Sequence, residues 1–156
     1  GNDIAGFGID GSASWRATKD LTFSVSGSYS GMEYQKTTGE RIAGDPADYV
    51  PKFTMAGSAN YDFNWASNIP GFVRLDYQHT DGWQVYPRNL LPAPALAGKQ
   101  DYLNARIGLN WNDLKLSIFA NNLLDEGAVT YPAFGGLFVP MRPQPRTLGL
   151  SLSYSF

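Results

Sequence analysis

The sequence of 156 residues contains no cysteine and a single histidine. Without cysteine the chain cannot form disulfides or a thiolate metal site, and its redox compartment stays open. Charged residues make up only 17% of the sequence, and the net charge of -2 gives no reason to expect a nucleic acid as partner. No run approaches the roughly 18 apolar residues of a transmembrane helix, which excludes a helical membrane protein. A signal peptide and an initiating Met are also missing, so we expect that Gly1 is not the native start.

Aromatic residues and glycine are abundant, with 14% Phe, Trp and Tyr and 17 Gly. The segment 146–156 shows how they are arranged. From Leu148 to Phe156 every even position is apolar, while Gly149 and three serines fill the odd positions. This strict alternation is the period-2 signature of a strand with two chemically different faces. The chain also ends on an aromatic residue of the apolar face, whereas the last residues of soluble proteins are commonly frayed and polar.

The same alternation recurs along the chain and predicts seven strands. They lie at residues 4–15, 21–29, 53–63, 72–79, 102–111, 114–121 and 148–156. The second, fourth and sixth connections are long, at about residues 32–51, 80–101 and 122–145, and the others are short. Such alternating lengths place all short turns at one end of an antiparallel sheet, as in outer-membrane barrels with short periplasmic turns and long extracellular loops. We therefore predict an all-β fold, an antiparallel transmembrane β-barrel.

Aromatic residues gather at both ends of the predicted strands. Beside the short turns, the predicted membrane aromatic belt comprises Trp15, Tyr61, Phe63, Trp111, Tyr154 and Phe156. Toward the long connections, the opposite belt comprises Tyr29, Phe53, Tyr77 and Tyr102. Two belts that bound an apolar band of roughly 25 Å fit the exterior of a barrel in a bilayer. The alternate face is rich in Ser, Asn and Gly and suits a wet or plugged lumen, and Phe119 interrupts the alternation of its strand.

Seven is an odd number of strands, whereas single-chain bacterial barrels have even numbers. An open sheet in lipid would leave two unpaired edges at a high energetic cost. We therefore expect residues 1–156 to be the C-terminal portion of a larger barrel, whose first strand pairs with the free edge of the last one. An eighth strand at about residues 134–141 would instead give a small stand-alone outer-membrane barrel with a structural or adhesive role, although Pro140 and two later prolines disfavour it. A soluble β-barrel that binds an apolar ligand is the third hypothesis.

Four segments in a consistent order carry a family resemblance. The run L-S-I-F-A-N-N-L-L-D at residues 116–125 contains an N-L-x-D motif, and Tyr131 follows it. Pro-Arg-Thr at residues 145–147 leads into a final strand that ends in Y-x-F. Residues 102–109 read Y-L-N-A-R-I-G-L, and a glycine-rich stretch at residues 6–15 ends on a tryptophan. Together they resemble the TonB-dependent receptors, and the resemblance spans nearly the whole chain.

This resemblance implies a location in the outer membrane of a Gram-negative bacterium. It implies a barrel of about 22 strands whose lumen is filled by an N-terminal plug domain. Such receptors take up scarce ligands such as iron–siderophore complexes, haem, cobalamin or oligosaccharides. The implied partners are outer-membrane lipid, the remaining strands and plug of the same receptor, the TonB energy-coupling complex acting through the plug, and the barrel-assembly machinery at the last strand. The plug is absent from this sequence, and residues 127–128 depart from the family pattern, in which an aromatic residue comes sooner.

The sequence predicts no catalytic residue, no cofactor and no metal site, and we expect a protein that is not an enzyme. The one histidine, His79, adjoins Thr80 and Asp81. Its two interpretations are a catalytic His–Asp pair at the barrel mouth and an outward-facing ring at the level of the lipid headgroups. The carboxylates are scattered and do not match a zinc or calcium site.

Charged residues of the polar face and aromatic residues of the long loops are candidates for ligand binding. Arg74 and Arg106 share the polar face with Asp76, and they would contact an anionic ligand or the plug, or form a charge ladder that ties the barrel wall together. The loop aromatics would stack on a ligand or cover one another. The predicted ligand-binding set is Arg74, Asp76, Trp83, Tyr86, Arg106, Tyr131 and Phe134.

Overall fold

The structure is a computed structural model that describes residues 3–39, 41–85, 96–133 and 139–155. A seven-stranded antiparallel sheet dominates it, in the order β2-β3-β5-β6-β7-β8-β9. These strands are β2 (Gly8–Arg16), β3 (Leu21–Ser30), β5 (Phe53–Ala66), β6 (Ile69–Thr80), β7 (Gln100–Trp111), β8 (Leu114–Asn121) and β9 (Thr147–Tyr154). Two short strands, β1 (Ile4–Ala5) and β4 (Glu33–Tyr34), pair separately. In the described ranges, no helix is long and apolar enough to cross a membrane.

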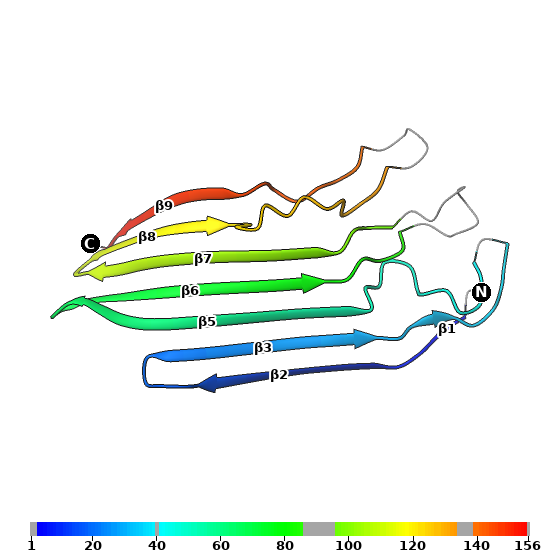
Figure 1. Cartoon of the computed structure of the whole chain (residues 1–156), viewed down its shortest axis with the longest axis horizontal. Coiled ribbons are helices and arrows are strands. Elements are labelled where there is room, and N and C mark those ends of the chain that lie inside the picture. The colour runs from blue at the N-terminus through cyan, green and yellow to red at the C-terminus, as the bar shows by residue number, and fades with distance from the viewer. Residues whose placement is uncertain (1–2, 40, 86–95, 134–138, 156) are drawn as a thin grey trace.

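Each strand of the main sheet pairs with its neighbours in sequence, so the chain runs up and down one wall (Figure 1). The turns at residues 17–20, 67–68 and 112–113 lie at one end of the wall, which we call the short-turn end. The connections at residues 31–52, 81–99 and 122–146 lie at the other, the loop end (Figure 1). Asn112 adopts a φ of 52°, a left-handed conformation that Asn tolerates in tight turns. The predicted all-β antiparallel sheet of seven strands is therefore confirmed.

The pairing register gives the sheet two chemically different faces. One row across the strands contains Trp15, Phe23, Ala59, Leu75, Ala105, Ala120 and Leu148. We call the side of the sheet on which this row lies the apolar face. A neighbouring row contains Ser14, Ser24, Ser58, Asp76 and Asn104, on the polar face. A slip of one residue in any pairing would move polar side chains onto the apolar face, so the alternation itself specifies the register.

No second layer of the described chain covers the apolar face. Trp15, Ile118 and Leu148 on this face are 65%, 58% and 71% exposed. The buried apolar side chains among those described are instead Tyr34, Ala47, Val85 and Ala97, which all lie at the loop end. Contiguous apolar surface of this extent on a protein marks a surface that meets a membrane or a partner.

The predicted first strand is interrupted at Gly6. A Cβ atom at Gly6 would lie 2.1 Å from the carbonyl oxygen of Gly31, so only glycine permits the two backbone segments to approach this closely. Phe7 accepts a hydrogen bond from the Gly31 amide at this crossing. Residues 4–5 then pair with β4 rather than with the main sheet, which alternation alone did not indicate.

The strands on either side of the turn at residues 67–68 are longer than predicted. Pairing continues beyond Phe63 through a register shift between Asn64 and Ala66, and it includes Pro70. The polar asparagine and the proline interrupt the alternation without ending the strands, because a bulge absorbs the extra residue.

The pairing register determines on which face of the sheet two aromatic residues, Tyr102 and Phe119, lie. Tyr102 was assigned to an aromatic belt, but it pairs with Gln78 on the polar face, so that assignment is wrong. Phe119 pairs with Arg106 and Gly149 and keeps the parity of the polar face. The eighth strand considered at residues 134–141 lies partly outside the described residues, and the part that is described forms only an isolated bridge between Tyr131 and Met141.

Candidate functional site

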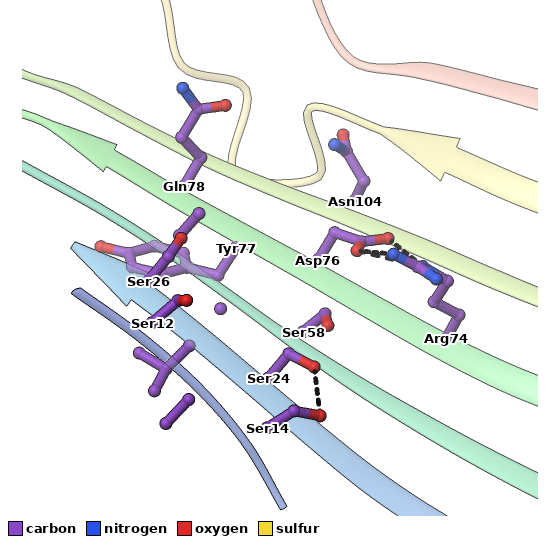
Figure 2. A pocket seen from close by; sticks show the side chains of 14 residues that line it. Ser12, Ser14, Ser24, Ser26, Ser58, Arg74, Asp76, Tyr77, Gln78 and Asn104 are labelled. Atoms are coloured by element: carbon purple, nitrogen blue, oxygen red, sulfur yellow. Dashed lines mark hydrogen bonds and ion pairs between the residues drawn. The ribbon is translucent and has the colours of Figure 1, made fainter. Parts of the chain in front are cut away.

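The polar face holds a hollow of about 590 Å³ across β2, β3, β5, β6 and β7. Its polar lining is Ser12, Ser14, Ser24, Ser26, Ser58, Arg74, Asp76, Gln78 and Asn104 (Figure 2). The alternate serines of β2 and β3 place short side chains side by side, and the Ser14 and Ser24 hydroxyls lie 3.1 Å apart. Short side chains leave room above the sheet, so the hollow is a consequence of the serine pattern.

Arg74 and Asp76 form a bidentate ion pair in the lining of this hollow (Figure 2). The two residues are two positions apart on β6 and therefore share a face. Arg74 Nε lies 2.8 Å from one carboxylate oxygen, and Nη2 lies 2.7 Å from the other. Both side chains are substantially exposed to solvent, so the pair orients the guanidinium more than it stabilises the fold.

Arg106 lies opposite Arg74 on the adjacent strand but has a different partner. Its guanidinium carbon is 5.5 Å from the centroid of the Phe119 ring, within the range of a cation–π contact. A Cβ atom at Gly149 would lie only 2.2 Å from Cζ of Phe119, so the ring rests directly on the β9 backbone. The predicted residues Arg74, Asp76 and Arg106 are thus brought together on one face.

At the loop end the three long connections are tied to one another. The Tyr49 amide donates a 2.7 Å hydrogen bond to the carbonyl of Gln84, and the Gly98 amide donates a 2.8 Å bond to that of Val129. The Tyr49 phenol is hydrogen-bonded to Tyr131, and desolvation together with this bond raises the pKa of Tyr49 above its ordinary value. The connections therefore form one joined layer above the sheet.

The loop aromatics of the predicted ligand-binding set are placed only in part. Trp83 is half-buried, and its carbonyl accepts a hydrogen bond from the Ala97 amide, which joins the two ends of the connection at residues 81–99. Tyr131 lies against Tyr49. Tyr86 and Phe134 lie outside the described residues. Their role in ligand binding remains a prediction.

Asn122 is a buried polar residue at this end whose role the sequence did not reveal. Its side-chain amide donates to the carbonyls of Glu126, at 3.0 Å, and Gln144, at 2.8 Å. Its Oδ1 accepts the Glu126 amide at 2.8 Å, and its own amide donates to Asn104 Oδ1 at 2.9 Å. Asn122 therefore joins the start and the end of the connection at residues 122–146, the third of the long connections.

Asp125 adds a further hydrogen bond between the start and the end of this connection, and we call Asn122 and Asp125 together the clasp. Asp125 adopts a φ of 56°, and its Oδ1 accepts a 3.0 Å hydrogen bond from the amide of Arg146 at the start of β9. The N-L-L-D segment thus has a structural reason for its spacing, since its Asn and Asp, at the start of the connection, both bind the end of it, at Gln144 and Arg146. Asn and Asp, which hydrogen-bond to nearby backbone and tolerate a positive φ, are the signal from which a clasp could have been suspected.

His79 lies between two carboxylates at the loop end of β6. Its Nδ1 is 2.7 Å from Asp101 and its Nε2 is 3.2 Å from Asp81, while the Tyr77 hydroxyl donates to Asp101 at 2.6 Å. Ionised carboxylates only accept hydrogen bonds, so both contacts are made when both ring nitrogens carry a proton. The ring also contacts Phe53, with centroids 5.8 Å apart, and its side chain is 13% exposed. This arrangement is a hydrogen-bonded cluster on the parity of the apolar face.

The aromatic residues near the short-turn end form contacts along the apolar face. Trp15 stacks on Phe23 with centroids 5.9 Å apart. Tyr61, Phe63 and Trp65 follow one another along β5, at centroid distances of 5.9 and 5.1 Å. Trp111 and Tyr154 are exposed on the same face, and Phe156 lies outside the described residues. Their role as a membrane belt stays a prediction.

In the part of the chain that the structure describes, no group of three or more His, Asp and Glu side chains could hold a metal ion. No protein-family model and no curated protein matches the chain. The chain is similar in structure to part of the ferric yersiniabactin uptake receptor FyuA from Yersinia pestis, a TonB-dependent siderophore receptor. The TM-score is 0.79 and the identity 21%, and the match covers 96% of this chain and 23% of the receptor.

The likeness shows the fold. The seven-stranded antiparallel sheet matches a segment of a TonB-dependent receptor barrel. Because the chain spans only 23% of that receptor, the matched region is one part of a larger barrel there. The receptor is a transport protein and not an enzyme.

Proposed function

We propose that this chain is a wall segment of a TonB-dependent transporter in the outer membrane of a Gram-negative bacterium. It is the C-terminal portion of the barrel, with the apolar face toward lipid and the polar face toward the lumen. The transporter takes up a scarce ligand such as an iron–siderophore complex, haem, cobalamin or an oligosaccharide. Uptake is powered by the TonB complex acting through a plug domain that fills the lumen.

The observation that carries this proposal is the uncovered apolar face of a sheet that has the fold of a receptor barrel segment. Burying apolar side chains stabilises a protein by about 25 cal/mol per Å² removed from water, and in water this face would forgo that gain. Lipid supplies an apolar environment for it. Each strand of the main sheet is hydrogen-bonded to the strands beside it. Strands that cross a bilayer need this pairing, because lipid offers the backbone no hydrogen-bond partner.

The outer edges of β2 and β9 have no partner strand among the described residues. In lipid each unpaired backbone group there would be costly, so we infer that further barrel strands of the same receptor pair with both edges. The barrel-assembly machinery is the partner that we infer for β9 during insertion. The long connections at residues 31–52, 81–99 and 122–146 then face the outside and meet the ligand first.

Site-specific fluorescence tests the membrane orientation. This sequence has no cysteine, so single cysteines can be introduced at Ile118 on the apolar face and at Ser117 on the polar face of β8. An environment-sensitive probe is attached to each variant of the full-length protein in liposomes. We expect nitroxide-labelled lipid to quench the Ile118→Cys probe and aqueous iodide to quench the Ser117→Cys probe. Equal quenching of both probes by iodide would contradict a lipid-facing apolar face.

Uptake is tested in cells that carry or lack the full-length gene. Labelled ferric siderophores, haem, cobalamin and oligosaccharides are supplied singly, with and without a protonophore that collapses the energy source of the TonB complex. We expect accumulation of one ligand class to require both the gene and the energised membrane. If no ligand shows this double dependence, the transport proposal fails even where the orientation proves right.

A further inference from the structure

One row of the polar face places two arginines side by side. Asn60, Arg74, Arg106, Phe119 and Gly149 occupy equivalent positions on β5, β6, β7, β8 and β9. Like charges directly opposite each other on adjacent strands are destabilising unless an anion neutralises them. The row therefore raises the question of which anion compensates each guanidinium.

Asp76 is hydrogen-bonded to only one of the two, although its charge also acts on the other. It binds Nε and Nη2 of Arg74 and thereby holds that guanidinium along its own strand. Among the residues that the structure describes, no carboxylate forms an ion pair with Arg106. Arg74, Arg106 and Asp76 together carry one net positive charge, and Asp62 of the same face is hydrogen-bonded to Asn60.

Arg106 is nonetheless held in one orientation. Phe119 lies against its guanidinium and is itself seated on Gly149, so the platform under the cation is supported by the β9 backbone. Arg106 is exposed to the polar face. A cation–π contact uses no hydrogen-bond acceptor, so the N–H groups of Arg106 that do not face the ring remain able to bind an anion. A planar edge with parallel N–H donors matches the two oxygens of a carboxylate.

We propose that Arg106, oriented by Phe119 and flanked by the Arg74–Asp76 pair, binds a carboxylate that arrives on the polar face. The inference rests on the proposed function in one respect, because a lumen gives this face something to bind. The carboxylate has two possible sources with the same chemistry. It belongs either to a polypeptide segment of the receptor that fills the lumen or to a soluble ligand that passes along the wall.

Chemical modification of arginine tests the site in the full-length protein folded in detergent. Phenylglyoxal reacts with free guanidinium groups, and peptide mass mapping reports the rate at each arginine. Arg16 is the matched internal control, since it is also exposed on the polar face and forms no ion pair with a described residue. Citrate is the carboxylate probe.

Two results support the proposal and distinguish the sources. If a soluble ligand is the source, Arg106 reacts readily, and citrate at about five times its Kd slows the reaction about sixfold while Arg16 is unaffected, since the free fraction is 1/(1 + [L]/Kd). If the protein supplies the carboxylate, Arg106 reacts slowly without citrate, and about 1 M NaCl restores the rate because salt screens an ion pair.

Two results overturn it. One is an Arg106 that reacts as fast as Arg16 with no protection by citrate. The other is a slow reaction that salt does not change, which indicates steric burial rather than an anion. The variant Phe119→Leu adds an independent readout, since it removes the platform and keeps an apolar side chain. We expect it to lose most of the protection, and full protection in this variant would refute the orienting role of Phe119.

The outcome is separable from the proposed function. Heat-modifiable gel mobility of Phe119→Leu shows whether its barrel still folds, and the quenching at Ile118→Cys reports the membrane orientation. If the barrel is correctly oriented but Arg106 is not protected from phenylglyoxal, only the carboxylate site is refuted. A protected Arg106 in a protein whose apolar face meets water sinks the transporter alone.

Discussion

Replacing Gly149 by alanine tests the seat of the Phe119 ring on β9. The added Cβ atom would lie 2.2 Å from Cζ, 2.7 Å from Cε1 and 2.9 Å from Cε2 of that ring. All three distances are below van der Waals contact, so the ring must leave its position. Because Arg106 stacks on the same ring, the displacement also removes the cation–π contact.

The expected magnitude follows from three contributions. Forcing an extra methyl group into a filled position costs about 1–3 kcal/mol. An exposed cation–π contact contributes about 0.5–1 kcal/mol, which is lost as well. Against these, replacing glycine by alanine stabilises by about 0.4–1 kcal/mol through the unfolded state. We therefore expect Gly149→Ala to lower the free energy of unfolding by about 1–3 kcal/mol.

Urea unfolding of the full-length protein in lipid vesicles, followed by tryptophan fluorescence, measures this change. The matched control is Gly57→Ala on β5, where the nearest atom to the added Cβ is 3.8 Å away, and we expect no loss of stability there. In the double variant with Phe119→Leu, the cost of the Gly149 change should fall by about 1 kcal/mol, since the ring that it strikes is gone. The reasoning is refuted if Gly149→Ala is as benign as the control, or if its cost is unchanged without the ring.

Three further changes probe the loop end. Asn122→Ala removes three side-chain hydrogen bonds of a buried residue, and we expect the unfolding free energy to fall by about 2–4 kcal/mol and chymotrypsin to cut the third long connection faster. Asp101→Asn weakens the acceptor for two side chains of β6 and should cost about 1–2 kcal/mol, whereas Asp10→Asn should cost nothing measurable. Tyr49→Phe removes a phenol whose pKa is raised by desolvation and by Tyr131, so the 295 nm absorbance lost in the variant should belong to a titration above pH about 10. A difference titration centred below that pH would contradict the hydrogen bond between Tyr49 and Tyr131.

The strands could be predicted because their two faces have different surroundings. Alternation of apolar and small polar residues needs only local sequence, and it placed all seven strands correctly. Boundaries were less accurate where one local feature contradicted the pattern. Pro70 suggested a strand end although its edge position in the bulged turn tolerates it, and Gly6 gave no sign that another backbone crosses it.

Even or odd position along a strand predicts the face on which a side chain lies, but it does not predict the partners of that side chain on other strands. Parity placed Arg74, Asp76 and Arg106 on one face. It could not show that one arginine pairs along its own strand while the other stacks on Phe119, because that depends on the register across strands. The same limitation hid Asp101, which lies opposite His79 but is distant in sequence.

Two aromatic rings of the polar face lie over glycines of the neighbouring strand. Phe72 lies over Gly108 on the polar face, where an added Cβ would meet its ring at 2.7 Å, and Phe119 lies over Gly149 in the same manner. Each ring covers backbone that glycine leaves open, so the glycines serve as seats for aromatic side chains of the neighbouring strand. Phe72 and Gly108 lie near the short-turn end. Phe119 and Gly149 instead lie two residues from the loop ends of β8 and β9, close to the hydrogen bonds of Asn122. Rings on glycine therefore brace the polar face near both ends of the sheet, and the hydrogen bonds of Asn122 add a second set of contacts at the loop end.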